Sequence, residues 1–457
     1  MHSHLELDDG SRVAVMGGGP AGSFFSYFLL QIARRAGLDL RVDVYEPRDF
    51  SALGPKGCNM CGGIISESLV QSLAAEGINL PSTVVQRGID SYSLHMDVGS
   101  VHIDTPLQEM RIAAVHRGAG PRGAKGDTGC LGFDGYLMQL AVAKGAQHIR
   151  ARVDGVAWED GRPRVKTQDG RQETYDLLAV ATGVNTPALK LFDASAFDFR
   201  PPQSTKTYIC EFYMGRETIQ AHLGTAMHVF LLNIPRLEFA ALIPKGDYVT
   251  MCLLGRDIDK ELVQSFMNSR EVQQCLPPGW QVPADFCHCS PKLNIVGATN
   301  PFADRLVFIG DCGVTRLFKD GIGAAYRTAK AAAITAVFEG VSAEDFRQHF
   351  WPACQYLATD NRIGRLVFLV TRQIQERRFL RRGVCRMVTA EQRKEGGHRR
   401  MSMVLWDTFT GSAPYRSVFL RSLHPAFWLR LLWETLAGTM SSGFSSAERR
   451  RPWTRVP

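Results

Sequence analysis

The sequence predicts an α/β fold in which a parallel sheet is interleaved with a mostly antiparallel sheet and followed by a helical C-terminal region. An apolar strand at Arg12, a glycine turn and an apolar stretch to Ala36 form a βαβ pattern whose second strand ends at Glu46. Two buried-type strands, 176–182 and 305–310, fit beside the first strand in a parallel sheet. The β-branched and aromatic segments between them, separated by turn residues, are typical of an antiparallel sheet.

These patterns divide the 457 residues into parts that are discontinuous in sequence. We expect the first part of a Rossmann-like nucleotide-binding domain at 11–190, with an excursion into the second domain at about 60–110; a substrate domain at 195–290; the second part of the nucleotide-binding domain at 291–345; and a basic, helical region at 346–457.

The net charge of +8 is concentrated near the C-terminus, where residues 362–457 hold 19 Lys and Arg against 6 Asp and Glu. No stretch reaches the roughly 20 apolar residues of a spanning helix, because Arg421, Arg430 and Glu434 interrupt the most apolar region. The first ten residues lack a secretory pattern, and the 11 cysteines have no framework spacing. We expect a cytoplasmic protein with reduced thiols.

The turn Gly17-Gly18-Gly19-Pro20-Ala21-Gly22 fits GxGxxG immediately after a strand and at the start of a helix. There, backbone N–H groups and the helix dipole meet a pyrophosphate, and Glu46 can accept the ribose hydroxyls. A purely structural glycine turn is the alternative. The predicted dinucleotide-binding residues are Gly17, Gly19, Pro20, Ala21, Gly22 and Glu46.

A second nucleotide site would distinguish FAD from NAD, and the segment RLVFIGDCG supplies a strand followed by Asp311. Asp311 can bond ribityl hydroxyls, and a helix that starts near Gly321 would direct its positive end at the flavin. An ordinary strand-to-helix turn capped by Asp is the alternative. The predicted residues of this site are Gly310, Asp311, Gly321, Ile322 and Gly323.

Four segments together resemble the geranylgeranyl reductase family, whose flavoprotein fold is shared with the para-hydroxybenzoate hydroxylase type. They are GGGPAG with Glu46, Cys61-Gly62-Gly63, Arg117 with Phe133-Asp134, and Gly310-Asp311 with GIGAA, and they span residues 12 to about 340. The resemblance implies FAD as the cofactor, Arg117 as a further cofactor-binding residue, and Cys61 near the isoalloxazine ring.

The chain departs from the family pattern in three places. The loop from Gly118 lengthens the spacing between Arg117 and Phe133-Asp134, and LFKDG replaces a segment in which the family often has a proline. Thr182-Gly183 stands where relatives in the wider group carry Asp-Gly, which argues against an aromatic hydroxylase that uses NADPH in the usual way.

Cys58 and Cys61 form a CxxC. Cys61 can be the catalytic residue that the resemblance implies, the two thiols can form a dithiol switch, or both can pack. Half of a zinc site completed by Cys287-His288-Cys289 is a further alternative, and the spacing does not favour it. We expect no metal.

The C-terminal stretch AFWLRLLWETLAG predicts a helix rich in Leu and Trp beside arginine-rich segments. Such a helix binds an anionic membrane surface or docks on the protein itself. We expect no binding to nucleic acid, since no recognised module accompanies the charge.

The sequence thus predicts an FAD-dependent oxidoreductase, a peripheral enzyme on the inner face of the membrane that reduces carbon–carbon double bonds of a polyprenyl or other lipophilic substrate. NAD(P)H, a reduced protein or a quinol are the candidate electron donors. The rivals are a flavin monooxygenase or halogenase-type enzyme and a membrane-peripheral electron carrier.

Overall fold

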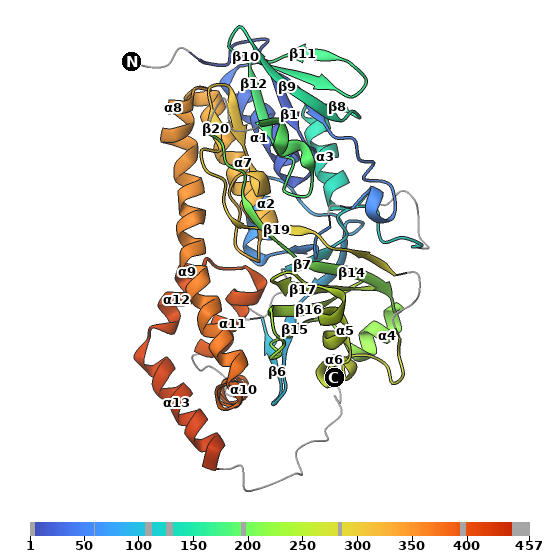
Figure 1. Cartoon of the computed structure of the whole chain (residues 1–457), viewed down its shortest axis with the longest axis vertical. Coiled ribbons are helices and arrows are strands. Elements are labelled where there is room, and N and C mark those ends of the chain that lie inside the picture. The colour runs from blue at the N-terminus through green and yellow to red at the C-terminus, as the bar shows by residue number, and fades with distance from the viewer. Residues whose placement is uncertain are drawn as a thin grey trace.

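The computed structural model describes residues 5–58, 60–105, 112–124, 131–192, 198–281, 286–393 and 399–440. Figure 1 shows two sheet regions arranged along the long axis, with helix α9 (Trp351–Glu376) running along one side of the molecule. The chain crosses between the two regions several times, because each draws its strands from separate parts of the sequence.

The first region is built on a six-stranded sheet with the order β20-β21-β12-β1-β2-β8. The pairs between β21, β12, β1, β2 and β8 are parallel, and β20 is antiparallel to β21. The bounds are β1 (Arg12–Met16), β2 (Arg41–Tyr45), β8 (Gln147–Ile149), β12 (Leu177–Val180), β20 (Phe302–Ala303) and β21 (Leu306–Phe308).

Both faces of this sheet are covered, which explains why the strands β12 and β21 are apolar throughout and β1 is apolar after Arg12. Val13 and Val15 face a core shared with the helices α1 (Pro20–Ala36), α3 (Phe133–Ala143) and α7 (Gly321–Phe338). Ala14 and Met16 face a second core, which is shared with the small sheet of β9 (Val153–Glu159), β10 (Arg162–Thr167) and β11 (Gln172–Thr174).

The second region is built on a seven-stranded sheet with the order β18-β14-β17-β16-β15-β5-β6. Every pair is antiparallel except β5 with β15, which is parallel. The bounds are β5 (Ser91–Met96), β6 (Gly99–Asp104), β14 (Tyr208–Tyr213), β15 (Ala226–Phe230), β16 (Leu237–Lys245), β17 (Tyr248–Gly255) and β18 (Cys287–Cys289).

Helices cover the second sheet on both faces. One face packs on α4 (Arg216–His222), α5 (Lys260–Met267) and α6 (Arg270–Gln273), and the opposite face packs on the C-terminal helices. Those are α9, α10 (Arg378–Gln392), α11 (Arg400–Thr410), α12 (Tyr415–Ser422) and α13 (Pro425–Met440).

Short elements connect the two regions. They are α2 (Glu67–Ala75), α8 (Ala343–Asp345), the helical turns Gly54–Lys56, Pro187–Phe192, Gly310–Cys312 and Phe346–Phe350, and the strands β3 (Ile64–Ile65), β4 (Val85–Ile89), β7 (Ile112–Val115), β13 (Gln203–Lys206) and β19 (Lys292–Val296).

The α/β class, the interleaved antiparallel sheet and the helical C-terminal region that the sequence predicts are confirmed. None of the described helices is both long and apolar enough to traverse a bilayer.

Candidate active site

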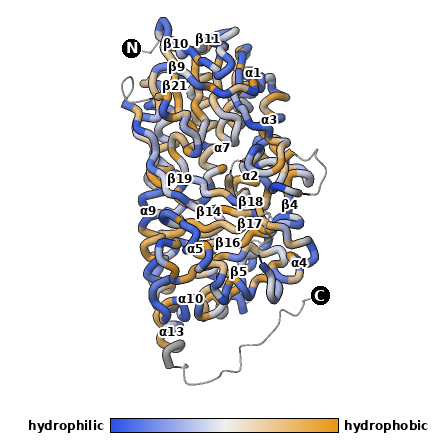
Figure 2. The backbone as a smooth tube through the Cα atoms, turned by 45° about the vertical axis from the view of Figure 1, so that its right-hand side comes forward, coloured by the Kyte–Doolittle hydropathy of each residue, from blue (hydrophilic) through white to orange (hydrophobic). Residues whose placement is uncertain are grey.

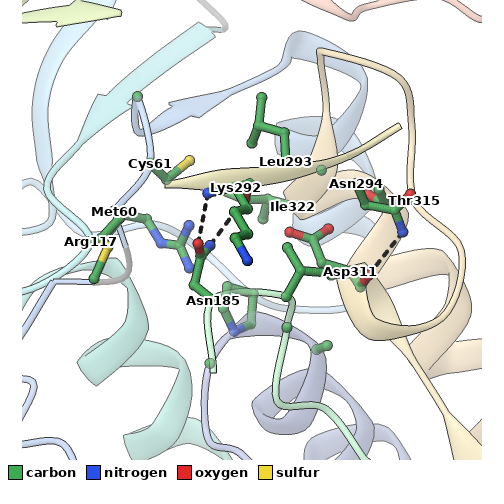
Figure 3. A pocket seen from close by; sticks show the side chains of 18 of the residues that line it. Met60, Cys61, Arg117, Asn185, Lys292, Leu293, Asn294, Asp311, Thr315 and Ile322 are labelled. Carbon is green, nitrogen blue, oxygen red and sulfur yellow. Dashed lines mark hydrogen bonds between the residues drawn. The ribbon is translucent and has the colours of Figure 1, made fainter. Parts of the chain in front are cut away.

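A pocket of about 360 Å³ lies between the carboxyl ends of β1 and β2 and the seven-stranded sheet. Figure 3 shows part of its lining, with Met60, Cys61 and Arg117 on one side, Asp311 and Thr315 on the other, and Asn185 and Lys292 between them. The wall therefore combines residues from both sheet regions.

The glycine turn forms one end of the pocket. Gly17 has a φ of 105°, and a Cβ added there would lie 2.6 Å from the Ala181 carbonyl oxygen, so only glycine fits. A Cβ at Gly22 would lie 1.9 Å from the Gly17 oxygen, because α1 and β1 approach each other closely here. Helix α1 starts after Gly19 with neither a side-chain cap nor an acidic residue in its first turn. Its N–H donors can therefore meet an anion in the pocket.

Glu46 follows β2 at the same end of the pocket. Its buried carboxylate accepts hydrogen bonds from the Gly18 and Arg48 backbone amides, both at 2.9 Å. These two bonds hold the carboxylate beside the glycine turn, in the place where a ribose hydroxyl of a bound dinucleotide would be accepted.

The second predicted nucleotide segment lies beside the first. Gly310 has a φ of 68°, and a Cβ there would lie 2.7 Å from the Ala21 Cβ, so the two segments pack directly against each other. Asp311 lines the pocket, and burial raises the pKa of its carboxyl group. Gly321 and Ile322, the first residues of α7, also line it.

A buried carboxylate marks the start of α7. Asp320 lies just before the helix, with ion-pair distances of 2.9 Å to Arg316 and 2.5 Å to Arg327, and it accepts a bond of 3.1 Å from Ser66 Oγ. A Cβ at Gly323 would lie 2.2 Å from the Asp320 carboxylate. Gly323 thus makes room for this acid.

Arg117 reaches the pocket despite the lengthened loop between it and Phe133-Asp134. It is buried, and its guanidinium pairs with Asp134 at the start of α3 through Nε and Nη2, at 2.6 and 2.9 Å. Burial alone would lower the pKa of Arg117, but Asp134 and the Cys61 sulfur beside it raise the pKa above its ordinary value. The loop that lengthens the spacing falls partly at 125–130, outside the described residues.

Cys61 lines the pocket and is partly buried, with its Sγ accepting a 3.5 Å bond from the Gly63 amide. Gly63 has a φ of 69°, and a Cβ there would lie 2.0 Å from the Val115 oxygen, so the CGG segment requires glycine here. Cys58 accepts a bond from the Met60 amide at 3.2 Å, and burial raises the pKa of its thiol to about 11. Both thiols are free.

Of the predicted site residues, the structure brings ten to the pocket wall and leaves three glycines just behind it. The ten are Gly17, Gly19, Pro20, Ala21, Glu46, Cys61, Arg117, Asp311, Gly321 and Ile322, and the three are Gly22, Gly310 and Gly323. Cys287 and Cys289 lie on β18 and, among the described residues, are in no group of three ligands close enough to hold a metal.

The end of the pocket opposite the glycine turn is apolar. Alternate residues of the central strands of the seven-stranded sheet form it: Ile209, Met227, Phe239, Ala241, Ile243, Cys252 and Leu254. We refer to these seven residues as the apolar wall. Strand β16 turns every second side chain toward the pocket because successive side chains of a strand point to opposite faces.

Sequence reasoning missed the polar residues at the side of the pocket. Asn185 donates to the Lys292 carbonyl at 3.1 Å and accepts from the Lys292 amide at 2.7 Å. Asn294 donates to the Asp311 carbonyl at 2.9 Å. Nothing in the local sequence pairs these residues, because each partner belongs to a distant segment.

The LFKDG segment brings a buried lysine to the pocket wall. Lys319 donates to the Asp407 carbonyl at 2.5 Å and lies 4.1 Å from the centre of the Tyr415 ring. Burial, and then the neighbouring Arg316, lower the pKa of Lys319 well below its ordinary value. This departure from the family pattern ties the start of α7 to the C-terminal helices.

Comparison of the sequence with family models and with curated proteins gives no match. The fold, in contrast, matches many solved structures. A geranylgeranyl bacteriochlorophyll reductase-like protein from Thermoplasma acidophilum is 13% identical with a TM-score of 0.63, over 91% of this chain and 99% of that one. A flavoprotein/dehydrogenase from Cytophaga hutchinsonii is 13% identical with a TM-score of 0.59, over 95% and 100%.

An oxygenase of 2-methyl-3-hydroxypyridine-5-carboxylic acid is 16% identical with a TM-score of 0.56, over 81% of this chain and 94% of that one. At these identities the likeness concerns the fold. The resemblance predicted from the four motifs is confirmed at that level: the chain has the flavoprotein fold shared by geranylgeranyl reductase-like and para-hydroxybenzoate hydroxylase-like proteins.

Proposed function

We propose that the protein is an FAD-dependent oxidoreductase that reduces carbon–carbon double bonds of a polyprenyl or similarly lipophilic substrate. The apolar wall carries this proposal, because it faces the glycine turn across one pocket. A polar aromatic substrate would leave this wall without a matching surface, whereas a hydrocarbon chain gains free energy by covering it.

The residues present fit FAD. The glycine turn and the start of α1, which has no side-chain cap, can bind a pyrophosphate. The Glu46 carboxylate can accept the adenosine ribose hydroxyls, and Asp311 can bond the ribityl chain. Bound and reduced FAD supplies a hydride to the substrate.

Saturation of an alkene also requires a proton on the second carbon. Cys61 lies in the pocket beside the Arg117 guanidinium and carries a thiol that can position the substrate or deliver this proton from Sγ. The apolar wall excludes water, which favours proton delivery by a fixed group over exchange with solvent.

The reaction type is tested by reducing the flavin-loaded protein anaerobically with dithionite and adding a polyprenyl alkene such as geranylgeraniol. We expect reoxidation of the flavin and a product heavier by two hydrogens per bond in the mass spectrum. Reoxidation by O₂ alone with a hydroxylated or halogenated product would support a monooxygenase or halogenase and overturn the reductase. Reoxidation by a quinone with no change in any alkene would support an electron carrier.

A second anaerobic experiment identifies the electron donor. NADH, NADPH, a reduced ferredoxin and a quinol are offered separately to the oxidised protein, and bleaching of the flavin band marks the donor that is used. This experiment is independent of the reaction with the alkene, because dithionite replaces the natural donor there.

We also propose that helices α12 and α13 place the protein on an anionic membrane surface. Phe427 and Leu431 of α13 are buried, so one face of the helix docks on the protein. The other face exposes large apolar side chains, with Trp433 at 70% and Leu429 at 67%. The exposed large apolar residues of this segment are Leu420 in α12, Leu423 directly after it, and Trp428, Leu429, Leu432, Trp433 and Leu436 in α13.

Charge favours an anionic lipid as the occupant of this surface. Arg416 and Arg421 of α12 and Arg377 and Arg378 at the start of α10 are exposed, and residues 362–457 carry 13 more basic than acidic side chains. Exposed Leu and Trp beside arginines are typical of helices that lie in the headgroup boundary. Figure 2 shows α10 and α13 at the same end of the molecule. A lipophilic substrate would reach the enzyme from such a surface.

A further inference from the structure

A buried cluster of two imidazoles and one thiol lies on the side of the seven-stranded sheet that faces away from the pocket. His95 comes from β5, His228 from β15, and Cys275 follows α6. Their exposed fractions are 7%, 6% and 4%. Among the residues that the structure describes, no other group of His, Cys, Asp or Glu side chains is arranged closely enough to hold a metal ion.

The three potential ligand atoms form a compact triangle. Nε2 of His95 lies 2.9 Å from Nδ1 of His228, and the Cys275 Sγ lies 3.7 and 3.6 Å from these two nitrogens. A point equidistant from the three atoms is about 2.0 Å from each, which is the length of a zinc–imidazole bond. A zinc–sulfur bond is about 2.3 Å, so the sulfur would retreat by a few tenths of an ångström.

The outward-facing ring nitrogens are held by hydrogen bonds. His228 Nε2 lies 3.1 Å from the Leu223 carbonyl oxygen, which can only accept, so His228 carries its proton on Nε2 and presents an unprotonated Nδ1 to the cluster. His95 Nδ1 lies 2.8 Å from Ser100 Oγ. Metal-binding imidazoles are oriented in this way by a partner on the second nitrogen.

From this geometry we infer a binding site for a thiophilic closed-shell cation, Zn²⁺ or Cu⁺, made by His95, His228 and Cys275. The site is separate from the flavin pocket and fastens the α5–α6 segment to the β5 and β15 strands. Thiolate and imidazole are the ligands that these two cations prefer. Zn²⁺ would complete its tetrahedron with a small ligand such as water, whereas Cu⁺ is satisfied by three ligands.

Cation binding involves proton transfers and no change of oxidation state. The Cys275 thiol loses its proton to solvent, and the sulfur binds as thiolate. The proton on His95 Nε2, which bonds His228 Nδ1 when no cation is bound, moves to Nδ1 and is donated to Ser100 Oγ. One proton is therefore released for each ion.

The test uses the full flavin-loaded chain, expressed in medium supplemented with zinc or, separately, with copper. Metal is counted by mass spectrometry after dialysis against a chelator, because a buried ion should resist removal until the chain unfolds. We expect one ion per chain, and X-ray absorption at the metal edge should show nitrogen and sulfur neighbours. The copper and zinc arms decide which cation is bound.

Four variants test the position of the ion and the support of its ligands. Cys275→Ala and His228→Ala should lose it, whereas Cys210→Ala should keep it, since Cys210 is equally buried on the same side of the same sheet. Ser100→Ala removes the hydrogen-bond partner of His95 and should weaken the affinity by about 10-fold or more.

Metal content well below one ion per chain in both media overturns the site, as does metal retained at the wild-type level in Cys275→Ala. A Cys275→Ala variant that fails to fold leaves the metal count and the absorption edge of the wild-type protein as the deciding measurements. Flavin content is recorded in every sample, so that a failure of the metal site is distinguished from a failure of the flavin site.

Discussion

The Arg117 guanidinium and the Asp134 carboxylate form a buried, two-bonded ion pair that joins the segment after β7 to the start of α3, with distances of 2.6 and 2.9 Å. Asp134→Ala leaves a buried arginine without its partner, so we expect the free energy of unfolding to fall by about 3–5 kcal/mol. Urea unfolding measures this. Asp154→Ala, which removes an exposed carboxylate on β9, should change it much less. Equal effects of the two substitutions would contradict a structural role for the pair.

The glycine turn is tested by flavin content. Gly19→Val places a branched side chain where α1 starts at the pocket wall, and the purified protein should lose its yellow colour and its 450 nm band, while circular dichroism stays that of a folded chain. Gly37→Asn at the other end of the same helix is the control, because Gly37 has open space around it and Asn tolerates its left-handed backbone. Full FAD occupancy in Gly19→Val would contradict the glycine turn as the pyrophosphate-binding site.

Glu46→Gln should weaken FAD by about 1–3 kcal/mol, the range for hydrogen bonds to a charged group. The amide keeps the shape of the side chain but offers a single acceptor oxygen to the Gly18 and Arg48 amides and to the ribose. Fluorescence titration of the deflavinated protein with FAD gives the dissociation constant. An unchanged constant would mean that Glu46 supports the turn without contacting the cofactor.

The two neighbouring cysteines should differ in catalysis. Cys61→Ser should lower single-turnover formation of saturated product by about 100-fold or more, the scale of a lost acid–base group, with FAD still bound. Cys58→Ser should have a much smaller effect, because Cys58 does not line the pocket and partial burial raises the pKa of its thiol to about 11. Equal losses at both positions would indicate a dithiol relay, and no loss at either would assign the pair to packing.

Glu211 should govern stability in acid. Its Oε1 accepts hydrogen bonds from Lys245 Nζ at 3.0 Å and from Thr250 Oγ1 at 2.6 Å. The His116 Nδ1 lies 3.3 Å from the same oxygen. Burial alone would raise the pKa of Glu211, but Lys245 and then His116 hold it below the ordinary value. A depressed pKa stabilises the fold above the unfolded-state pKa of about 4.3, and this contribution is lost as the pH falls through the folded-state pKa.

In Glu211→Gln the free energy of unfolding at pH 7 should therefore fall by about 3–5 kcal/mol, because a buried lysine is left without its carboxylate. Between about pH 5 and pH 2 this free energy should change less in the variant than in the wild type. Denaturant unfolding at a series of pH values gives both results. Parallel pH profiles for the two proteins would show that Glu211 is not the responsible carboxylate.

The proposed lipid surface is tested with substitutions on the exposed side of α13, because removal of the tail would also uncover the core beneath Phe427. Replacing Leu429, Leu432 and Trp433 together by Ser should reduce binding to vesicles of phosphatidylserine and phosphatidylcholine by about 10-fold or more. Tyr213→Ser on β14 is an exposed control. Wild-type binding should weaken in high salt. Unchanged sedimentation of the triple variant would contradict the lipid surface.

The glycine turn and Gly310-Asp311, which the sequence pattern singles out, lie together at the pocket in the structure, and their role in binding a cofactor stays a prediction. At Gly17 and Gly310 the backbone φ is positive, and an added Cβ would meet Ala181 or Ala21, so both positions require glycine and the requirement is visible as a glycine in the sequence. The family resemblance implies Arg117 at the cofactor site, and the structure places it at the pocket wall, paired with Asp134, despite the lengthened loop between the two residues.

The apolar wall and the His95 cluster show what a sequence cannot reveal alone. The alternation in LEFAALIPK indicates a strand, yet the face that meets the pocket depends on neighbouring strands from elsewhere in the chain. His95 is 133 positions from His228 and 180 from Cys275, so no motif spacing links them. Long-range strand pairing creates both sites.

The alternation along β16 also has a consequence for how this protein can change. Phe239, Ala241 and Ile243 face the pocket, while Ala240 and Leu242 belong to the core on the other side of the sheet. Under the proposed function, exchanging the first three residues for smaller or larger apolar ones would change the size of the lipophilic substrate that fits the pocket, while the residues of the second core stay the same. A few point mutations along one strand thus offer descendants of this protein, or an engineer, a route to new substrates that requires no rebuilding of the fold.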